Sequence, residues 1–367
     1  MGKDAAPRTI RAAAVLLAAL AAACTSLETR IIEPRSRPIL AAASLERMEA
    51  ALDIERRRFQ VPDGPALAYR VVSPRAYGTQ FHFQRSDKDV TFRFNLANAP
   101  DERLPVPTAG TVVLLHGWSM DGMSMLPWAL ALAERGWHAL IVDLRSHGAS
   151  DRAPVGYGPH EGRDVAALLA ALPEGEERGD ALVLFGVSYG AVAALYAAAQ
   201  AEPGLVDAVI ALSPYANAAD GIRGMIAGMK AVPASGMRSR MVRGYARMRY
   251  DEARIDEAIR MAGERLDVDL AGVDVRQAAA AVPACVLLLH GTSDGFFPME
   301  SVQSLADAAP QGQLVPLDRE HHFTAPMRMD WLAAPLADWI GSVREGGACP
   351  AFVLPEPPSP ETLQAGS

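Results

Sequence analysis

From residue 111 onward, short continuous apolar runs alternate with longer segments in which apolar residues recur at helical spacing. Unbroken apolar runs are typical of strands buried on both faces, as in parallel sheets covered by helices. They predict strands at residues 111–115, 139–142, 181–185, 208–212, 285–289 and 313–317, and helices at 125–135, 162–172, 191–201, 299–309 and 329–344. The alternation predicts an α/β fold with a doubly wound, mostly parallel sheet.

The chain before this point follows a different pattern. Residues 45–58 place apolar side chains near one helical face, and residues 59–72 have the pattern of a strand, a turn and a second strand. Residues 80–95 add two alternating segments around a polar break at 86–89. These features predict an antiparallel start to a folded domain that spans residues 59–345.

The first residues have the charge order of a secretory signal. Lys3, Arg8 and Arg11 precede an apolar run at residues 12–23, which is shorter than the about 20 residues of a bilayer-spanning helix. We therefore predict a signal peptide over residues 1–23 and export from the cytoplasm.

The apolar run ends in Leu20-Ala-Ala-Ala-Cys24, which resembles the lipobox of bacterial lipoproteins. Leucine usually stands three residues before the lipidated cysteine, and here it stands one position earlier. We favour lipidation of Cys24 and anchoring to a membrane of the cell envelope. Cleavage after an alanine, which would give a periplasmic or secreted protein, stays open.

A long insertion separates the strands predicted at 208–212 and 285–289, and we predict a helical lid at about residues 217–280. It carries methionines at near-helical spacing: Met225, Met229, Met237, Met241 and Met248. Methionine in this pattern favours core packing over the alternative, an adaptable apolar wall for an acyl chain.

Composition excludes several classes of function. The net charge is −8, and we identify no Arg/Lys stripe with interleaved aromatic residues, which disfavours nucleic acid as a partner. Cys24, Cys285 and Cys349 are too few for a disulfide framework and match no zinc site, so we expect no metal and no cofactor. Residues 24–58 read as a tether with a short helix, and the proline-rich residues 346–367 are expected to be disordered.

The clearest chemical signal is Gly186-Val-Ser188-Tyr-Gly190, a G-x-S-x-G pattern between an apolar strand and an alanine-rich helix. A nucleophile elbow needs this order, because the serine occupies a strained turn and the glycines allow close backbone approach. A G-x-S-x-G pattern can also occur by chance, but the strand before it and the helix after it strengthen the prediction of an elbow. Ser188 is therefore the predicted nucleophile.

An earlier strand supplies a second part of the site. The apolar residues 112–115 run into His116-Gly-Trp118, where the backbone can donate to a developing oxyanion. The predicted oxyanion donors are the N–H groups of Trp118 and Tyr189. His116 precedes the nucleophile, whereas the base in this arrangement comes last, so a structural role is expected for it.

The acid and the base must then follow Ser188 in that order. Asp294 comes just past the strand at 285–289 and is the predicted acid, with Asp220 as its rival. His322 follows the last strand and precedes an apolar residue, which favours it over His321 as the base.

These ordered motifs resemble the α/β-hydrolase superfamily over residues 59–343, particularly its serine aminopeptidase-like, lysophospholipase-like and dienelactone hydrolase-like branches. The resemblance includes Asp143-Leu-Arg-Ser-His-Gly-Ala-Ser150, similar to a D-x-R-x-H-G-x-S loop, followed by Tyr157-Gly158 with Glu161 and Asp164. It implies that Asp143, Arg145 and His147 organise the loop beside the active site.

The predicted function is hydrolysis of a small-molecule carboxylic ester through an acyl-enzyme intermediate. The same triad serves aminopeptidases, thioesterases and acyltransferases, and a surface lipoprotein that binds without chemistry is a further alternative. An aminopeptidase would need acids that bind the substrate amine, for which the insertion offers Asp251, Glu252, Asp256 and Glu257. The pattern leaves the oligomeric state open.

Overall fold

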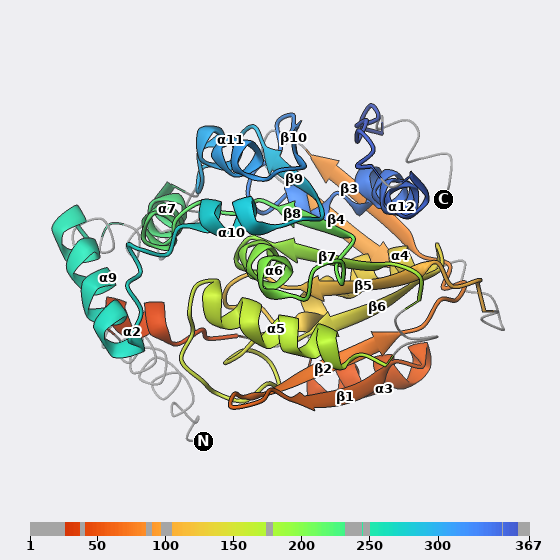
Figure 1. The fold of residues 1–367 in the computed structure, drawn as a ribbon, viewed down its shortest axis with the longest axis horizontal. Helices are drawn as coiled ribbons and strands as arrows, with labels where there is room; N and C mark the ends of the chain where they lie inside the picture. Colours follow the sequence, from red (N-terminus) through yellow and green to blue (C-terminus); the bar gives the residue numbers. More distant parts are fainter. Residues whose placement is uncertain are drawn as a thin grey trace, which may run out of the picture.

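The centre of the molecule is an eight-stranded sheet with the strand order β1-β2-β6-β5-β7-β8-β9-β10 (Figure 1). The computed structural model describes residues 26–36, 41–85, 90–96, 105–173, 179–231, 244, 250–346 and 348–358. The strands of the sheet are β1 (Glu55–Gln60), β2 (Ala66–Val72), β5 (Gly110–Leu115), β6 (Trp137–Val142), β7 (Leu182–Val187), β8 (Ala208–Leu212), β9 (Cys285–Gly291) and β10 (Gly312–Leu317). All pairings from β6 to β10 are parallel, and β1 and β2 are antiparallel, which confirms the predicted fold class.

Helices cover both faces of this sheet. One face is packed by α5 (Pro159–Ala171), α6 (Tyr189–Gln200), α10 (Val275–Ala281) and α11 (Met299–Ala308), and the other by α4 (Leu126–Ala133) and α12 (Met329–Gly346). The strands contribute to the two cores alternately: Val113 and Leu115 join one core, and Val112 and Leu114 join the other. This alternation is why the strands appear in the sequence as unbroken apolar runs.

The helix expected at residues 45–58 ends earlier than the sequence pattern predicts. Helix α3 (Ala42–Leu52) ends at Asp53, whose φ of 54° breaks the helix, and β1 begins at Glu55 rather than at residue 59. The boundary was wrong because Ile54 continues the apolar helical face although it lies beyond the helix. The alternating segments at 80–95 form the predicted pair, β3 (Gln80–Arg85) and β4 (Val90–Asn95), as an antiparallel two-stranded sheet.

The insertion between β8 and β9 is helical, with α7 (Ala218–Ala231), α9 (Glu252–Leu266) and α10. A short helix before the domain, α2 (Leu27–Ile32), packs against α9 (Figure 1). Met225 packs partly buried against the core, and the other four methionines of the pattern lie outside the described residues or side chains. Within the described part of the chain, no helix has the length and apolar character needed to cross a bilayer.

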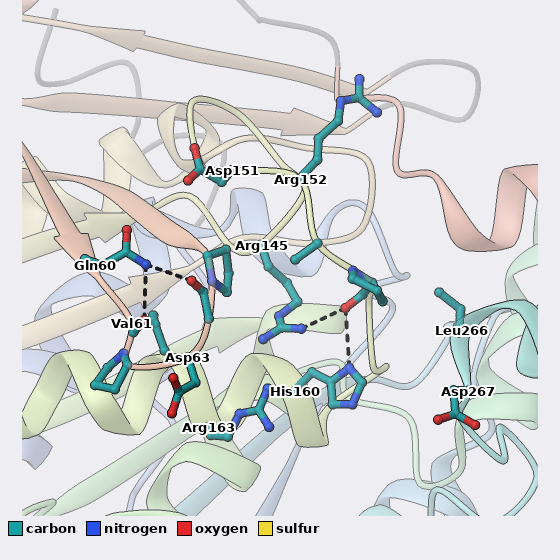
Figure 2. Close-up of a pocket in the computed structure, with 15 residues that line it drawn as sticks. Gln60, Val61, Asp63, Arg145, Asp151, Arg152, His160, Arg163, Leu266 and Asp267 are labelled. Atoms are coloured by element: carbon teal, nitrogen blue, oxygen red, sulfur yellow. Dashed lines mark hydrogen bonds between the residues drawn. The ribbon is translucent and has the colours of Figure 1, made fainter.

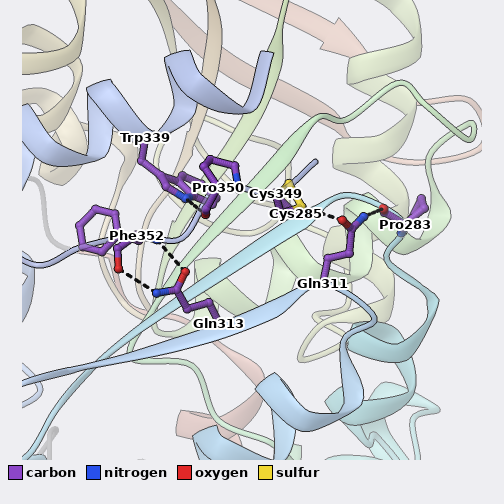
Figure 3. Close-up of a disulfide and its surroundings, with 8 residues drawn as sticks. All are labelled: Pro283, Cys285, Gln311, Gln313, Trp339, Cys349, Pro350 and Phe352. Atoms are coloured by element: carbon purple, nitrogen blue, oxygen red, sulfur yellow. Dashed lines mark hydrogen bonds between the residues drawn. A yellow bond between two sulfur atoms is a disulfide. The ribbon is translucent and has the colours of Figure 1, made fainter. Parts of the chain in front are cut away.

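The expectation of a disordered C-terminal tail is wrong for residues 348–358. Cys349 forms a disulfide with Cys285, the buried Phe352 exchanges two hydrogen bonds of 2.8 Å with the Gln313 side chain, and the Trp339 indole donates to the Pro350 carbonyl (Figure 3). The segment has little apolar surface of its own, but its partners lie in β9, β10 and α12. The cysteines also differ from expectation, since two of the three pair across 64 residues.

Candidate active site

Ser188 lies at the sharp turn between β7 and α6. Its φ of 53° and ψ of −113° place it in a region that residues other than glycine rarely occupy. The flanking glycines are required, because a Cβ on Gly186 would lie 2.1 Å from the Gly190 carbonyl oxygen, and a Cβ on Gly190 would lie 2.2 Å from that of Leu115. The motif therefore forms the strand-turn-helix elbow that its sequence context indicates.

The side chains of Ser188, His322 and Asp294 form one hydrogen-bonded chain. The His322 Nε2 atom lies 3.0 Å from Ser188 Oγ, and its Nδ1 lies 2.8 Å from Asp294 Oδ2. Ser188 follows β7, Asp294 follows β9 and His322 follows β10, and these parallel strands end at the same edge of the sheet. Parallel strands thus bring together residues that are far apart in the chain.

Backbone groups hold the Asp294 carboxylate. Its Oδ1 accepts hydrogen bonds from the N–H groups of Phe296 at 2.7 Å and Phe297 at 3.1 Å, which leaves Oδ2 for His322. Burial acts to raise the pKa of Asp294, but the hydrogen bond and charge of His322 outweigh it and hold the pKa below its usual value. Asp294 is therefore ionised at neutral pH and can fix the His322 tautomer with a proton on Nδ1.

Asp220 and His321, the alternatives to Asp294 and His322, have other partners. Asp220 is on α7 with an exposed side chain that pairs with Arg223 at 2.8 Å. The backbone N–H of His321 donates to Thr324 Oγ1, and burial, followed by the charge of Arg85, lowers the pKa of the His321 ring. The structure brings His322 to Ser188 and Asp294 to His322, and it leaves Asp220 and His321 outside this chain of hydrogen bonds.

The two predicted oxyanion donors flank Ser188. A Cβ on Gly117 would lie 3.8 Å from Ser188 Cβ, so the loop that carries Trp118 passes close to the serine. Tyr189 is the first residue of α6, and an N–H in the first turn has no carbonyl acceptor within its own helix. The Trp118 ring stacks on Tyr157 at 5.1 Å and meets the edge of Tyr189 at 5.1 Å, which holds the loop against the elbow.

His116 is fully buried and serves the backbone. Its Nδ1 lies 2.9 Å from the Gly117 carbonyl oxygen, and its Nε2 accepts the N–H of Leu144 at 3.1 Å. Burial lowers the pKa of His116, so the ring is neutral with its proton on Nδ1. Both ring nitrogens are occupied, which agrees with the structural role expected for this residue.

The loop after β6 is held by buried charged groups. Asp143 accepts hydrogen bonds from the N–H groups of Gly122 at 2.6 Å and Ala149 at 2.9 Å. Arg145 pairs with Asp164 on α5 through two hydrogen bonds of 2.7 and 2.6 Å. These contacts support the expected loop-organising role and involve none of the three hydrogen-bonded side chains around Ser188.

His147 is buried in the same loop. Burial lowers the pKa of His147 to about 3, and the neighbouring His116, if protonated, would act in the same direction. The ring therefore stays neutral under ordinary conditions. Its Nδ1 lies 2.9 Å from the Arg145 carbonyl oxygen, and its ring centroid is 5.5 Å from that of Trp118.

Sequence reasoning missed two residues around His322. The Phe296 ring stacks on the imidazole with ring centroids 4.7 Å apart. His290, which is fully buried, donates from Nε2 to the Phe297 carbonyl at 2.9 Å, and this nitrogen lies 3.8 Å from Asp294 Oδ2. Both belong to the stretch that contains Asp294, so their nearness to the predicted acid was a signal for them.

Two exposed apolar side chains come close after site residues in the sequence. Met120, just after Trp118, is 42% exposed, and Phe323, just after His322, is 50% exposed. The Phe323 ring meets the edge of Phe296 at 5.1 Å. Exposed apolar side chains thus lie beside the hydrogen-bonded chain.

A separate surface groove of about 840 Å³ lies between the β1–β2 turn, the loop after β6 and the end of α9 (Figure 2). Its lining includes Gln60, Arg145, His160 and Asp267 but not Ser188, Asp294 or His322. Gln60 and Arg145 already bind protein carbonyls there. The groove is therefore not the site of the hydrogen-bonded chain.

A protein-family model described as serine aminopeptidase, S33, matches residues 106–322. The chain belongs to this family, a branch of the α/β-hydrolase superfamily. Among relatives, it is 33% identical over 113 residues to the uncharacterized protein YqkD of Bacillus subtilis, a match that covers 30% of this chain and only 37% of that protein. It is 26% identical over 230 residues to the AB hydrolase superfamily protein YisY of the same organism, covering 58% of this chain and 84% of YisY.

Solved structures agree with membership of this hydrolase family at the level of the fold. An esterase from Pyrococcus furiosus superposes with a TM-score of 0.55 at 14% identity, over 85% of this chain and 96% of the esterase. A membrane phospholipase A described as a bacterial virulence factor gives 0.52 at 18% identity, over 92% and 99%. At these identities the structural likeness shows the α/β-hydrolase fold alone.

Proposed function

We propose that this protein is a serine hydrolase that cleaves carboxylic esters through an acyl-enzyme intermediate. The observation that carries the proposal is the hydrogen-bonded chain from Ser188 through His322 to Asp294, with distances of 3.0 and 2.8 Å. Family membership supports a hydrolase, and the elbow geometry supports serine as its nucleophile.

In the proposed mechanism, Ser188 Oγ attacks the ester carbonyl carbon while its proton moves to His322 Nε2. The carbonyl oxygen becomes an oxyanion, which the N–H groups of Trp118 and Tyr189 stabilise. Collapse of this intermediate breaks the ester C–O bond, and the proton on His322 passes to the departing alkoxide. Water then attacks the acyl-enzyme, gives its proton to His322, and releases the carboxylic acid and the free serine.

Ester cleavage is favoured over aminopeptidase activity by the state of the acids in the insertion. Asp251 caps α9 by accepting the N–H of Arg254, Asp256 pairs with Arg223, and the exposed Glu257 pairs with Arg260. Three of the four acids that the insertion offers are thus engaged within it rather than left to bind a substrate amine. The apolar residues around Ser188 also suit an acyl chain, and the structural neighbour from Pyrococcus furiosus is described as an esterase.

We further propose that the protein is exported and anchored through a lipid on Cys24. The sequence pattern around Cys24 supports the anchor. The Cys285–Cys349 disulfide supports export, because such bonds form and persist in oxidising compartments outside the cytoplasm. Incorporation of labelled palmitate into the wild type and its loss in Cys24→Ala would test the anchor.

The function is tested by hydrolysis of p-nitrophenyl butyrate by the wild type, Ser188→Ala and Ser213→Ala. Ser213 is a matched control, because it is a buried serine with a φ of 53° at the end of the next strand, β8. We expect Ser188→Ala to lower kcat by about 10⁴-fold or more and Ser213→Ala to remain active. A folded wild type without activity, or an active Ser188→Ala, would contradict the proposal.

A further inference from the structure

The N-terminal chain joins the domain at the edge of the sheet that carries Ser188. Helix α2 packs on α9, and its residue Ile31 is buried. The Ile31 carbonyl accepts the Tyr157 hydroxyl at 2.7 Å, and the Tyr157 ring stacks on Trp118. The entering chain is thus connected through one side chain to the loop that supplies a proposed oxyanion donor.

The apolar N-terminal stretch ends close to this point. Cys24 precedes Ser26, the residue before α2, by two positions, and two residues of extended chain span at most about 7 Å. A lipid on Cys24 would therefore hold the membrane surface next to the beginning of α2. Because α2 is fixed to α9 and to Tyr157, such an anchor also restricts which face of the domain can meet the membrane.

Exposed apolar side chains lie beside the site and on the helix that binds the entering chain. Met120 and Phe323 are 42% and 50% exposed beside the site, and Met261 is 36% exposed on α9, the helix that binds α2. Large apolar side chains that gather around a site opening are typical of surfaces that meet a membrane or another apolar partner. Because Met261 lies on the helix that binds the entering chain, we favour a membrane over another apolar partner.

We propose that the carboxyl edge of the sheet faces a lipid bilayer, with Met120, Met261 and Phe323 in contact with it. The site would then take its substrate, an ester of a lipid or another amphiphile, directly from that bilayer. The substrate class rests on the serine hydrolase function proposed above. Contact through these apolar side chains does not require lipid charge, so uncharged phosphatidylcholine is the membrane on which it is measured by itself.

The orientation is tested with the full-length protein, isolated with its native N-terminal processing, on phosphatidylcholine vesicles that carry bromine on the acyl chains. Bromine quenches tryptophan emission on contact. We compare Phe323→Trp with Val353→Trp, each after subtraction of the wild-type signal. Val353 is a matched control, because it is 80% exposed and follows Cys349, which is bonded to Cys285 at the amino end of β9.

We expect the vesicles to quench most of the emission added by Phe323→Trp and little of that added by Val353→Trp. Equal quenching of the two variants, or quenching of neither, would overturn the orientation. Hydrolysis of soluble p-nitrophenyl acetate separates this result from the function itself. Cleavage of the soluble ester without cleavage of vesicle-embedded esters would refute the substrate class and leave the hydrolase in place. Cleavage of neither ester would refute the hydrolase function, and quenching alone would then decide the orientation.

Discussion

The two edges of the central sheet are built differently. At the carboxyl edge, residues other than glycine adopt positive φ angles after five of the parallel strands, at Ser119, Ser146, Ser188, Ser213 and Arg319. At the amino edge, the chain is tied down by the Cys285–Cys349 disulfide, the buried Phe352 and the hydrogen bond from the Trp339 indole of α12.

The carboxyl edge carries the proposed catalytic groups, and the amino edge carries contacts that stabilise the fold. A residue held in a sparsely populated backbone region costs about 1–3 kcal/mol and persists only where the surrounding structure determines it. The carboxyl edge contains such positions, and it also contains buried, neutral histidines such as His116, His147 and His290. The amino edge carries cross-links that stabilise the same strands from their other end. Changes at the amino edge should therefore affect unfolding and leave activity unchanged, whereas loss of activity should follow only from changes at the carboxyl edge.

The largest effect is expected from Asp294→Asn at the carboxyl edge. The amide cannot fix the required His322 tautomer, so we expect kcat for a soluble ester to fall about 10⁴-fold. Asp220→Asn is the matched control, because Asp220 pairs with Arg223 on the surface, and its kcat should stay close to the wild-type value. A large loss in Asp220→Asn and a small one in Asp294→Asn would reverse the assignment of the acid.

At the amino edge, the double change Cys285→Ser and Cys349→Ser should lower the free energy of unfolding by about 4 kcal/mol. This value follows from the entropy of closing a loop of the 64 residues that separate the cysteines. Denaturant titration measures the loss, and ester hydrolysis at room temperature should be unchanged. A folded variant with wild-type stability and reduced activity would contradict the separation of the two edges.

The buried His147 should make stability depend on pH. Its pKa of about 3 in the folded protein lies below the about 6.5 of an unfolded chain, so the unfolded state binds the proton first as pH falls. This histidine alone should remove about 2 kcal/mol of stability between pH 6.5 and pH 5, and its effect should grow until the folded form is protonated near pH 3.

Denaturant titrations of the wild type and His147→Gln at pH 7 and pH 5 give the free energy of unfolding of each protein at each pH. The contribution of His147 is the difference between the two proteins in the stability lost from pH 7 to pH 5. The variant should lose less stability than the wild type over that interval. An identical loss in both proteins would show that His147 is not held neutral by burial.

The smallest effect is expected from Trp339→Phe. The change removes the hydrogen bond of 2.8 Å to the Pro350 carbonyl while an aromatic ring remains, so unfolding should become easier by about 1 kcal/mol. Thermal unfolding measures this loss, and activity should be preserved. A loss as large as that of the double cysteine variant would show that the tail depends on the indole rather than on the disulfide.

The sequence predicts the sheet well, because buried parallel strands and covering helices leave a strong apolar pattern. The six strands expected from residue 111 onward all appear, and the strand-turn-helix context of Ser188 leads directly to the observed elbow. The position of Asp294 just past a strand favours it over Asp220, and the apolar residue after His322 favours it over His321. In the structure His322 contacts both Ser188 and Asp294. Parallel strands end at one edge of the sheet, so residues that each follow a strand come together there. Local motifs are therefore enough to predict these contacts.

Contacts between distant segments explain what the sequence did not predict. The order of residues 348–358 depends on Cys285, Gln313 and Trp339, none of which lies in that segment. The roles of His290 and Phe296 depend on the position of the His322 ring, which only the folded chain defines. Local composition describes neither kind of contact.

The most direct test of the central claim, that Ser188 is the nucleophile, is fluorophosphonate labelling of the wild-type protein followed by mass spectrometry of its peptides. We predict a single phosphonylated residue, Ser188, and no adduct after prior unfolding in denaturant. An adduct on another serine, or none on the folded protein, would contradict the account.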